Sequence, residues 1–245
     1  MRRVLFHFFG RPIHSYPAML YLGLTLGMFV GNYAAHVAGV DPFRLFIASY
    51  ITAFPAIGGA RVLHVITNWK YYREHRAEIW DLKQGGMAQY GGLLIAVPLS
   101  VPLVRVLALP FGPFWDIGSL TILTGMIFTR FGCLLNGCCS GRPSNSWLSM
   151  YLPNRSGVWE RRMPTQLFEA AWATGLLVSG VLIWRHLPFQ GALFIYTAGG
   201  YSLGRLALES LRDLRSTGKR FTSNHAISLF IIAVSVVALA GRTLL

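Results

Sequence analysis

The sequence predicts an all-α polytopic membrane protein in which seven transmembrane helices and interfacial loop segments form a single domain over residues 1–245. The 245 residues are 53% hydrophobic and only 13% charged, whereas a soluble domain carries about 25% charged residues. Mean hydropathy is +0.48. Seven stretches approach the ~20 apolar residues that cross a bilayer core of ~30 Å. This composition argues against a water-soluble globular enzyme, and the alternating ten-residue segments of a membrane β-barrel are absent.

The predicted spans are residues 16–40, 44–66, 91–109, 114–137, 165–184, 190–208 and 224–240. Gly23, Gly27 and Gly31 share one face of the first span, which favours close packing on another helix of the same chain over dimerisation. Pro98 and Pro102 predict a kink in the third span. Residues 67–89 mix aromatic and basic side chains, which is typical of a segment at the lipid head-group level.

The net charge indicates an anionic partner. Twenty-two Lys and Arg oppose nine Asp and Glu, which gives +13. Nucleic acid and phospholipid head groups both fit such a charge, and the apolar background favours membrane lipid and no nucleic acid.

The basic residues are distributed unequally between the two sides of the predicted bundle. With the loops assigned alternately, 15 basic residues fall on the side of the N-terminus and 4 on the other side, Arg44, Arg105, Arg185 and Arg242. The positive-inside rule would therefore place the N-terminus in the cytoplasm.

Ionisable residues inside spans are costly and mark functional sites by default. Four are Arg61, Arg130, Arg205 and Glu209. On a helix, Tyr201, Arg205, Glu209 and Arg212 would fall within about 80° of arc, on one face. A structural ion pair is one interpretation. The alternative, which we favour, is that the spare guanidinium donors bind an anion such as a phosphodiester.

Two glycine-rich segments are further candidates. Arg130 precedes a run with glycines and Asn136 that ends at Gly141, where exposed backbone N–H groups beside an arginine would form an anion-binding nest. Paired glycines also flank Tyr90, a pattern that equally fits an ordinary turn into a helix.

Three cysteines lie within seven residues: Cys133, Cys138 and Cys139. They are too few and too clustered for a disulfide framework. Because C-x-x-C spacing and a nearby histidine are both lacking, we expect no metal ion and no cofactor. Buried packing residues are the favoured interpretation, and a catalytic thiol remains open.

The motifs together resemble bacterial phosphatidylglycerol–prolipoprotein diacylglyceryl transferases along nearly the whole chain. They are Ser15-Tyr16, Gly59-Ala60-Arg61, Asn68-Trp69-x-Tyr71-Tyr72, Gly85-Gly86-x-x-x-Tyr90-Gly91-Gly92, Arg130-x-x-Cys133-x-x-Asn136-Gly137-Cys138-Cys139-x-Gly141, Pro164-Thr165-Gln166-x-x-Glu169 and Tyr201-x-x-x-Arg205-x-x-x-Glu209-x-x-Arg212. Each motif alone is weak, but seven in family order are specific.

The resemblance implies a multi-pass enzyme of the bacterial inner membrane. Members transfer the diacylglyceryl group of phosphatidylglycerol to the lipobox cysteine thiol in the signal peptide of a prolipoprotein, and release glycerol phosphate. It also implies that the N-terminus lies outside the cell, which opposes the positive-inside count. We favour the family orientation, in which the basic side meets anionic head groups at the active face.

The resemblance and the residue patterns together give the expected site. The predicted catalytic residues are Arg130, Arg205 and Tyr90. The predicted substrate-binding residues are Tyr16, Arg61, Cys133, Asn136, Gly141, Tyr201, Glu209 and Arg212. Tyr90 stands where well-studied members have a histidine proposed as general base, and a phenol of pKa ~10 is a poor base at pH 7.

Further departures from the family pattern are Pro17, Gln89 and Thr129. Two alternatives therefore stay open. One is a divergent member that uses another acceptor, and the other is a non-catalytic protein that binds or transports phospholipid.

Overall fold

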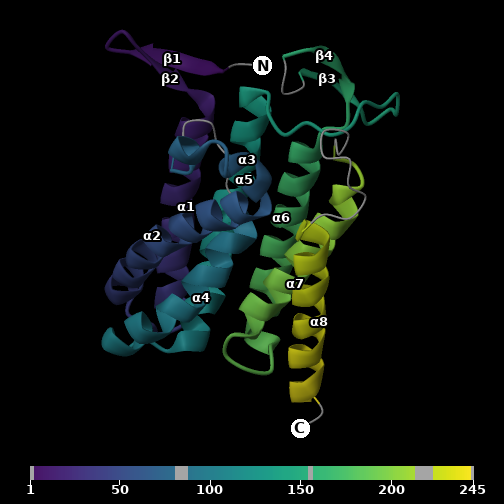
Figure 1. The fold of residues 1–245 in the computed structure, drawn as a ribbon. Helices are drawn as coiled ribbons and strands as arrows, with labels where there is room; N and C mark the ends of the chain where they lie inside the picture. Colours follow the sequence, from purple (N-terminus) through teal and green to yellow (C-terminus); the bar gives the residue numbers. More distant parts are fainter. Residues whose placement is uncertain (1–2, 81–87, 154–156, 213–222, 244–245) are drawn as a thin grey trace. The chain divides into compact units, whose positions relative to one another are not determined.

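The computed structural model describes residues 3–80, 88–153, 157–212 and 223–243 (Figure 1). The chain forms two compact units. The first comprises Met1–Ala34 and Trp115–Leu245, and the second comprises Ala35–Phe114.

The first unit contains most of α1 and α5, both β-hairpins and the last three long helices. Its elements are β1 (Val4–Phe8), β2 (Arg11–His14), α1 (Ser15–Val37), α5 (Phe111–Asn136), β3 (Met150–Pro153), β4 (Trp159–Arg162), α6 (Thr165–Ile183), α7 (Ala192–Glu209) and α8 (Ser223–Thr243). α6, α7 and α8 lie side by side (Figure 1). Both hairpins join the same end of the unit, because β2 leads directly into α1 while β3 and β4 connect α5 to α6.

The second unit is built on two long helices. Its elements are α2 (Pro42–Thr67), the short α3 (Trp69–Tyr72), a 3₁₀ turn (Arg76–Glu78) and α4 (Gln89–Val106). α4 continues through Pro98 and Pro102, and the predicted kink stays a prediction. α2 and α4 cross at Gly59 and Gly91, where a Cβ on either glycine would collide with the backbone oxygen of the other.

Each of the seven predicted spans contains a long helix, so the helical prediction is confirmed in the described residues. Four helices there are long and apolar enough to cross a membrane: Ser15–Val37, Pro42–Thr67, Phe111–Asn136 and Thr165–His186. The count of seven spans stays a prediction. The expectation of a single domain also stays one.

The all-α prediction is wrong in two places. β1 pairs with β2 and β3 pairs with β4, both antiparallel. The first hairpin turns at Phe9 and Gly10, whose φ angles of 46° and 74° are the left-handed values of a two-residue hairpin turn. Strands of four or five residues are too short to register in a search for ~20-residue apolar spans.

α1 packs on α5 through its three glycines, which confirms the prediction of intramolecular packing. A Cβ on Gly23 would lie 2.8 Å from the carbonyl oxygen of Gly125, and one on Gly27 would lie 2.6 Å from that of Thr121. Gly31 likewise meets the hydroxyl of Thr121. The glycine face therefore brings the two backbones into contact.

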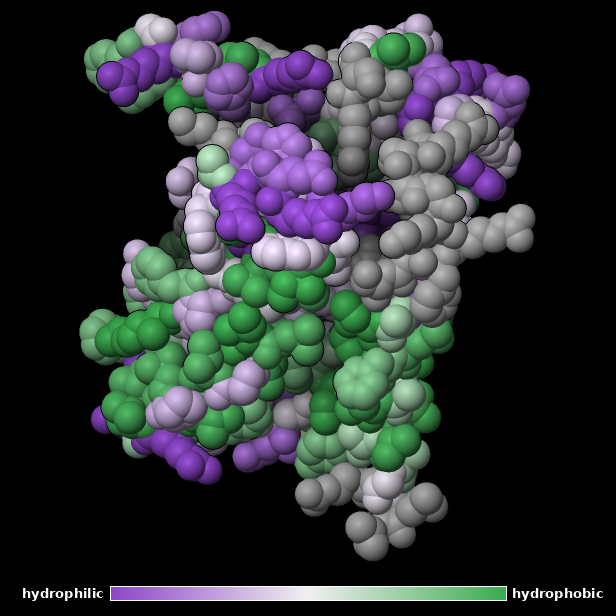
Figure 2. All heavy atoms as spheres, viewed as in Figure 1, coloured by the Kyte–Doolittle hydropathy of each residue, from purple (hydrophilic) through white to green (hydrophobic). Residues whose placement is uncertain are grey.

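α5, α6 and α7 share a buried apolar core. Leu123 and Met126 of α5 pack against Ala173 and Leu176 of α6, and Tyr201 of α7 packs on this cluster. The outer surface of α8 carries exposed apolar side chains, including Phe230 and Val237, and is green in Figure 2. A helix that is apolar on its outer face suits a bilayer.

Candidate functional site

Glu169 is the centre of a buried ion-pair cluster in the first unit. Its carboxylate lies 2.6 Å from a guanidinium nitrogen of Arg130, 3.1 Å from one of Arg205 and 2.9 Å from one of Arg212. A guanidinium nitrogen of Arg205 also lies 3.6 Å from the carboxylate of Glu209, its neighbour one helical turn away. The pairing of Arg205 with Glu209 was predicted from their spacing and is confirmed.

Three helix ends position this cluster. Arg130 lies six residues before the end of α5, Glu169 lies four residues after the start of α6, and Arg205 lies four residues before the end of α7. At 1.5 Å per residue, the charged groups are therefore within ~6–9 Å of the helix ends. They lie at the end of the unit that carries the hairpins.

Arg212 reaches the cluster by a different route from the predicted one. α7 ends at Glu209, so Arg212 does not lie on the helical face with Tyr201. Its backbone instead forms an isolated antiparallel bridge with Gly141, and the N–H of Arg142 donates to the carbonyl of Leu211 at 2.9 Å. Short strand-like pairing, and not helical periodicity, brings this guanidinium to Glu169.

Gly141 lies where two chain segments nearly touch. A Cβ there would lie 2.5 Å from the carbonyl oxygen of Leu211 and 2.8 Å from a methyl carbon of Thr165. The N–H of Gly141 donates to the carbonyl of Met163, and its carbonyl accepts from buried Arg162. Glycine is therefore required by packing, while the predicted part of Gly141 in substrate binding stays a prediction.

The predicted backbone nest between Arg130 and Gly141 is contradicted at four of its N–H groups and stays a prediction at Cys139 and Ser140. The N–H groups of Gly137, Cys138, Gly141 and Arg142 all donate to carbonyl oxygens of the protein. The predicted end of the helix is confirmed, since α5 ends at Asn136 and Gly137 has a φ of 74°.

The arginines are more accessible than the carboxylates they contact. The side chains of Arg130, Arg205 and Arg212 are 14%, 12% and 26% exposed, against 3% for Glu169 and 4% for Glu209. Three positive charges oppose two negative charges, so the cluster keeps one surplus positive charge. The more accessible groups of the cluster are therefore guanidiniums and the more buried ones are carboxylates, an arrangement suited to binding an anion.

Two predicted tyrosines lie next to this cluster. Tyr16, in the first turn of α1, is within electrostatic range of Arg130 and the three cysteines, and its backbone faces Gly132 of α5. Tyr201 is within electrostatic range of Arg130. The structure thus brings together Tyr16, Arg130, Tyr201, Arg205, Glu209 and Arg212.

The three cysteines lie at the same end of the unit. Their sulfur atoms are all within 4.8 Å of one another, and Asn136 lies beside Cys138. Hydrogen bonds from the other two thiols, together with the positive charges of Arg130 and Arg212, hold the pKa of Cys139 below its ordinary value. The predicted site residues Cys133 and Asn136 therefore border the arginine cluster.

Arg61 belongs to the second unit and is buried there. Its guanidinium donates to the carbonyl oxygens of Ile79 and Glu78 at 2.7 and 2.6 Å and lies 5.3 Å from the ring centre of Tyr72. These contacts fasten residues 78 and 79 to α2. Nearby, Tyr71 donates to the carboxylate of Glu78, and this hydrogen bond raises the pKa of Tyr71.

Tyr90, the predicted catalytic tyrosine, also belongs to the second unit. It is buried in the first turn of α4, directly before the Gly91 contact with α2. The other predicted glycines of this motif, Gly85 and Gly86, lie outside the described residues.

Sequence reasoning missed Glu169 and Asp116 as buried charges within spans. Asp116 accepts from the backbone N–H groups of Gly191 and Phe194 at 2.7 and 2.9 Å and so caps the start of α7. The signal that selected Arg130 and Arg205, an ionisable residue in an apolar stretch, was present at both positions. Arg162, which is buried in β4, was also missed, because the sequence pattern predicts a loop there.

These features define a class: a helical membrane protein with a buried, positively charged polar centre near one end of its helices. The comparisons with known proteins then give the family. The prolipoprotein diacylglyceryl transferase family matches residues 3–240, and the chain belongs to this family.

Individual relatives are similar over most of their length. A phosphatidylglycerol–prolipoprotein diacylglyceryl transferase of Bacillus velezensis is 29% identical over 239 residues, covering 94% of this chain and 88% of the relative. The protein of the same name from Geobacillus kaustophilus is 29% identical over 250 residues, covering 96% and 90%. One from Clostridium botulinum strain Langeland is 27% identical over 218 residues, covering 86% and 85%.

Proposed function

We propose that this protein transfers the diacylglyceryl group of phosphatidylglycerol to the lipobox cysteine thiol of a prolipoprotein and releases glycerol phosphate. The observation that carries the proposal is the buried cluster of three arginines with Glu169 and Glu209, which leaves one surplus positive charge. A phosphodiester carries one negative charge. The names and coverage of the relatives support the same reaction.

The depth of the cluster fits a phospholipid donor. The charged groups lie ~6–9 Å from the ends of α5, α6 and α7, and the head-group region of a bilayer occupies a comparable thickness outside the ~30 Å hydrocarbon core. If these arginines bind the phosphate of phosphatidylglycerol, the acyl chains of that lipid lie beside apolar helix surface. A soluble anion would gain nothing from that surface.

The reaction replaces a C–O bond by a C–S bond. The acceptor sulfur attacks the glycerol carbon that carries the phosphate, the acceptor loses its thiol proton, and glycerol phosphate leaves with the electron pair of the broken bond. Arg130 and Arg205 stabilise the charge that grows on the leaving phosphate oxygen. Glu169 and Glu209 hold both guanidinium groups in place from the buried side.

The other predicted site residues also take part. The donor site includes Tyr16 and Tyr201, which border Arg130, and the third arginine of the cluster, Arg212. It also includes Cys133, Asn136 and Gly141, at or just after the end of α5. Arg61 fastens the segment before residues 81–87, and Tyr90 stands in the motif after it. On the strength of the family motifs, we propose a part in substrate binding for Arg61 and a catalytic part for Tyr90.

The membrane arrangement is part of the proposal. Seven spans in the bacterial inner membrane form one domain, with the hairpin end of the first unit on the outer side. That orientation places the basic loops against anionic head groups, in line with the family and against the positive-inside count.

The decisive experiment is a transfer assay in membranes, with phosphatidylglycerol labelled in its acyl chains and a lipobox peptide. Arg205→Ala removes a guanidinium that stabilises the leaving phosphate, and we expect transfer to fall at least ~100-fold. Arg185→Ala, an exposed arginine in the turn after α6, is the matched control and should keep full transfer. Undiminished transfer by Arg205→Ala would contradict the site.

The same assay separates the two alternatives. Consumption of phosphatidylglycerol without labelling of the lipobox peptide would indicate a family member with another acceptor. Saturable phosphatidylglycerol binding without release of glycerol phosphate would indicate a non-catalytic lipid-binding or transport protein. Either result would replace the proposed reaction.

A further inference from the structure

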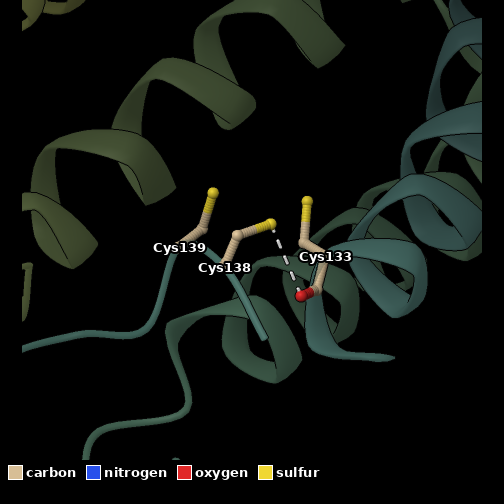
Figure 3. A group of neighbouring side chains, drawn as sticks. All are labelled: Cys133, Cys138 and Cys139. Atoms are coloured by element: carbon tan, nitrogen blue, oxygen red, sulfur yellow. Dashed lines mark hydrogen bonds between the residues drawn. The ribbon is translucent and has the colours of Figure 1, made fainter. Parts of the chain in front are cut away.

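The only three cysteines of the chain come together at one point of the first unit. Cys133 is buried on the last turns of α5, Cys138 is half-buried and Cys139 is exposed. Their sulfur atoms lie within 4.8 Å of one another. Figure 3 shows the three thiols on the same side of the turn that follows α5.

The backbone adopts an unusual conformation to place these thiols. Gly137 and Cys139 both have left-handed φ angles, of 74° and 63°. The value at Cys139 is costly for a residue with a side chain, and such residues gather at functional sites. The turn brings the Cys138 sulfur to 3.6 Å from the carbonyl oxygen of Cys133, the contact drawn in Figure 3.

A second layer of buried polar groups holds the turn in place. The hydroxyl of Thr165 donates to the carbonyl of Cys139 at 2.7 Å, and the amide of Gln166 donates to the carbonyl of Cys138 at 2.6 Å. Thr165 and Gln166 are 0% and 1% exposed. Outer hydrogen bonds of this kind are what orient the ligands of a metal site.

From this geometry we propose that Cys133, Cys138 and Cys139 form a three-thiolate site for a soft metal ion of the Zn²⁺ class. Zinc–sulfur bonds of ~2.3 Å in a tetrahedron place sulfur atoms ~3.8 Å apart, so the observed spacing needs a change of about 1 Å or less. Soft thiolate ligands favour zinc and Cu(I) over hard cations. The prediction of no metal was based on the spacing of the cysteines in the sequence. That spacing does not reveal a turn that brings Cys138 and Cys139 back to Cys133.

The site leaves one coordination position for a further ligand. Zinc takes four ligands, and three protein ligands with an open fourth position are typical of catalytic zinc. Cys139 is the exposed member, so the open position lies on the accessible side. Three thiolates and one Zn²⁺ carry a net charge of −1, and the guanidinium groups of Arg130 and Arg212 lie within electrostatic range of Cys139.

The open position gives this site a role in the proposed transfer, and this step rests on the proposed function. Cys133, Cys138 and Cys139 would hold the metal ion, and the ion would lower the pKa of an acceptor thiol at the open position, whose proton would pass to solvent. The acceptor sulfur forms the C–S bond while the C–O bond to phosphate breaks, and the electron pair of that bond stays on the phosphate. The metal ion changes neither charge nor oxidation state.

Cadmium is the direct probe of the metal site. The purified full-length protein, stripped with chelator and titrated with Cd²⁺, should bind one ion per chain and develop the sulfur-to-cadmium charge-transfer absorption of a thiolate site. Cys133→Ser, Cys138→Ser and Cys139→Ser should each weaken binding at least ~10-fold, within the range known for lost ligand-shell contacts. Asn145→Ala, an exposed change on the same loop, should bind like the wild type.

Two results would overturn the metal site. One is Cd²⁺ binding that persists unchanged in the triple Cys133→Ser, Cys138→Ser, Cys139→Ser variant. The other is a count of one free thiol in place of three in unreduced, denatured protein, because a disulfide would then explain the cluster. Folding of each variant is checked by helical circular dichroism, so that lost binding is not confused with lost structure.

Transfer measured with and without metal separates this inference from the proposed function. Chelation should lower transfer to the lipobox peptide, and added Zn²⁺ should restore it in the wild type but not in the triple variant. Full transfer by the metal-stripped protein would overturn the metal role and leave the proposed function standing. Thiol-dependent Cd²⁺ binding without any transfer would support the metal site and contradict the proposed function.

Discussion

At the residue scale, Glu169 holds the site together. A single carboxylate, 3% exposed, contacts three guanidinium groups from three different segments. Buried charges are tolerated when they are paired, and removing one partner leaves the others uncompensated. The surplus charge offered to a phosphodiester therefore depends on the carboxylates as well as on the arginines.

Glu169→Gln tests this dependence directly. The amide keeps the size of the side chain but removes the charge that compensates Arg130, Arg205 and Arg212. We expect the free energy of unfolding to fall by about 3–5 kcal/mol, together with a loss of transfer activity. Thermal denaturation in detergent and the labelled-lipid assay measure the two effects.

Glu74→Gln is the matched control for this change. Glu74 also pairs with an arginine, Arg73, but the two side chains are 64% and 60% exposed. Exposed ion pairs contribute about 0–1 kcal/mol, so the control should lose little stability. Equal losses for both variants would show that the central position of Glu169 has no special weight.

At the element scale, glycines determine how closely the helices approach. α1 meets α5 through Gly23, Gly27 and Gly31, and α2 meets α4 through Gly59 and Gly91. Because lipid is as apolar as the helices, close backbone packing and not hydrophobic burial drives such contacts. A methyl group in these positions would separate helices that carry site residues.

Adjacent glycines on α2 give a sharp test. Gly59→Ala places a methyl group against the carbonyl of Gly91 and 2.9 Å from Ile95, and the clash should cost about 1–3 kcal/mol. Gly58→Ala has nothing within 4 Å and should be neutral or stabilise by up to ~1 kcal/mol through helix propensity. Melting temperatures that do not separate the two variants would contradict the observed helix crossing.

The start of α7 depends on a carboxylate from α5. Asp116 accepts two backbone hydrogen bonds, from Gly191 and Phe194. Asp116→Ala leaves both N–H groups without this acceptor, and we expect a loss of about 1–2 kcal/mol, the usual cost of a missing helix cap. Hydrogen exchange at the start of α7 should rise, while exchange in the middle of α6 should not. Unchanged exchange at residues 191–195 would contradict the capping role.

At the scale of the whole molecule, the net charge of +13 bears on how the protein is oriented in the membrane. Arg142, Arg161, Arg162 and Arg212 all lie at the hairpin end of the first unit, where the arginine cluster also lies. Basic side chains at that end are suited to recruit anionic lipid to the site. If these basic side chains bind anionic lipid on the outer side, the positive-inside rule gives the wrong orientation for this chain.

Cysteine labelling at the two ends of α6 tests the orientation. Trp147, 87% exposed, precedes α6, while Arg185 follows it, and α6 itself rises ~28 Å. In the thiol-free triple serine background, an impermeant maleimide should label Trp147→Cys in intact spheroplasts and Arg185→Cys only after permeabilisation. The reverse pattern would establish the orientation that the positive-inside rule predicts.

Local patterns in the sequence were enough to predict the helices, the glycine face of α1 and the charged positions Arg130, Arg205 and Glu209. Hydrophobic runs and i, i+4 spacing are properties of neighbouring residues, and they survive folding unchanged. The hairpins were missed because strands of four or five residues produce no comparable run.

Only the tertiary structure decided which charges and thiols meet. Glu169 and Arg205 are 36 residues apart, and no period in the sequence relates them. Arg212 lies beyond the end of α7 and reaches Glu169 through a backbone bridge to Gly141, while two left-handed residues bring three thiols together. By itself the sequence determined a helical membrane protein with arginines inside its apolar stretches, because apolar length and helical period are local. The partners of those arginines depend on how helices pack and turns fold back, which only the assembled chain determines.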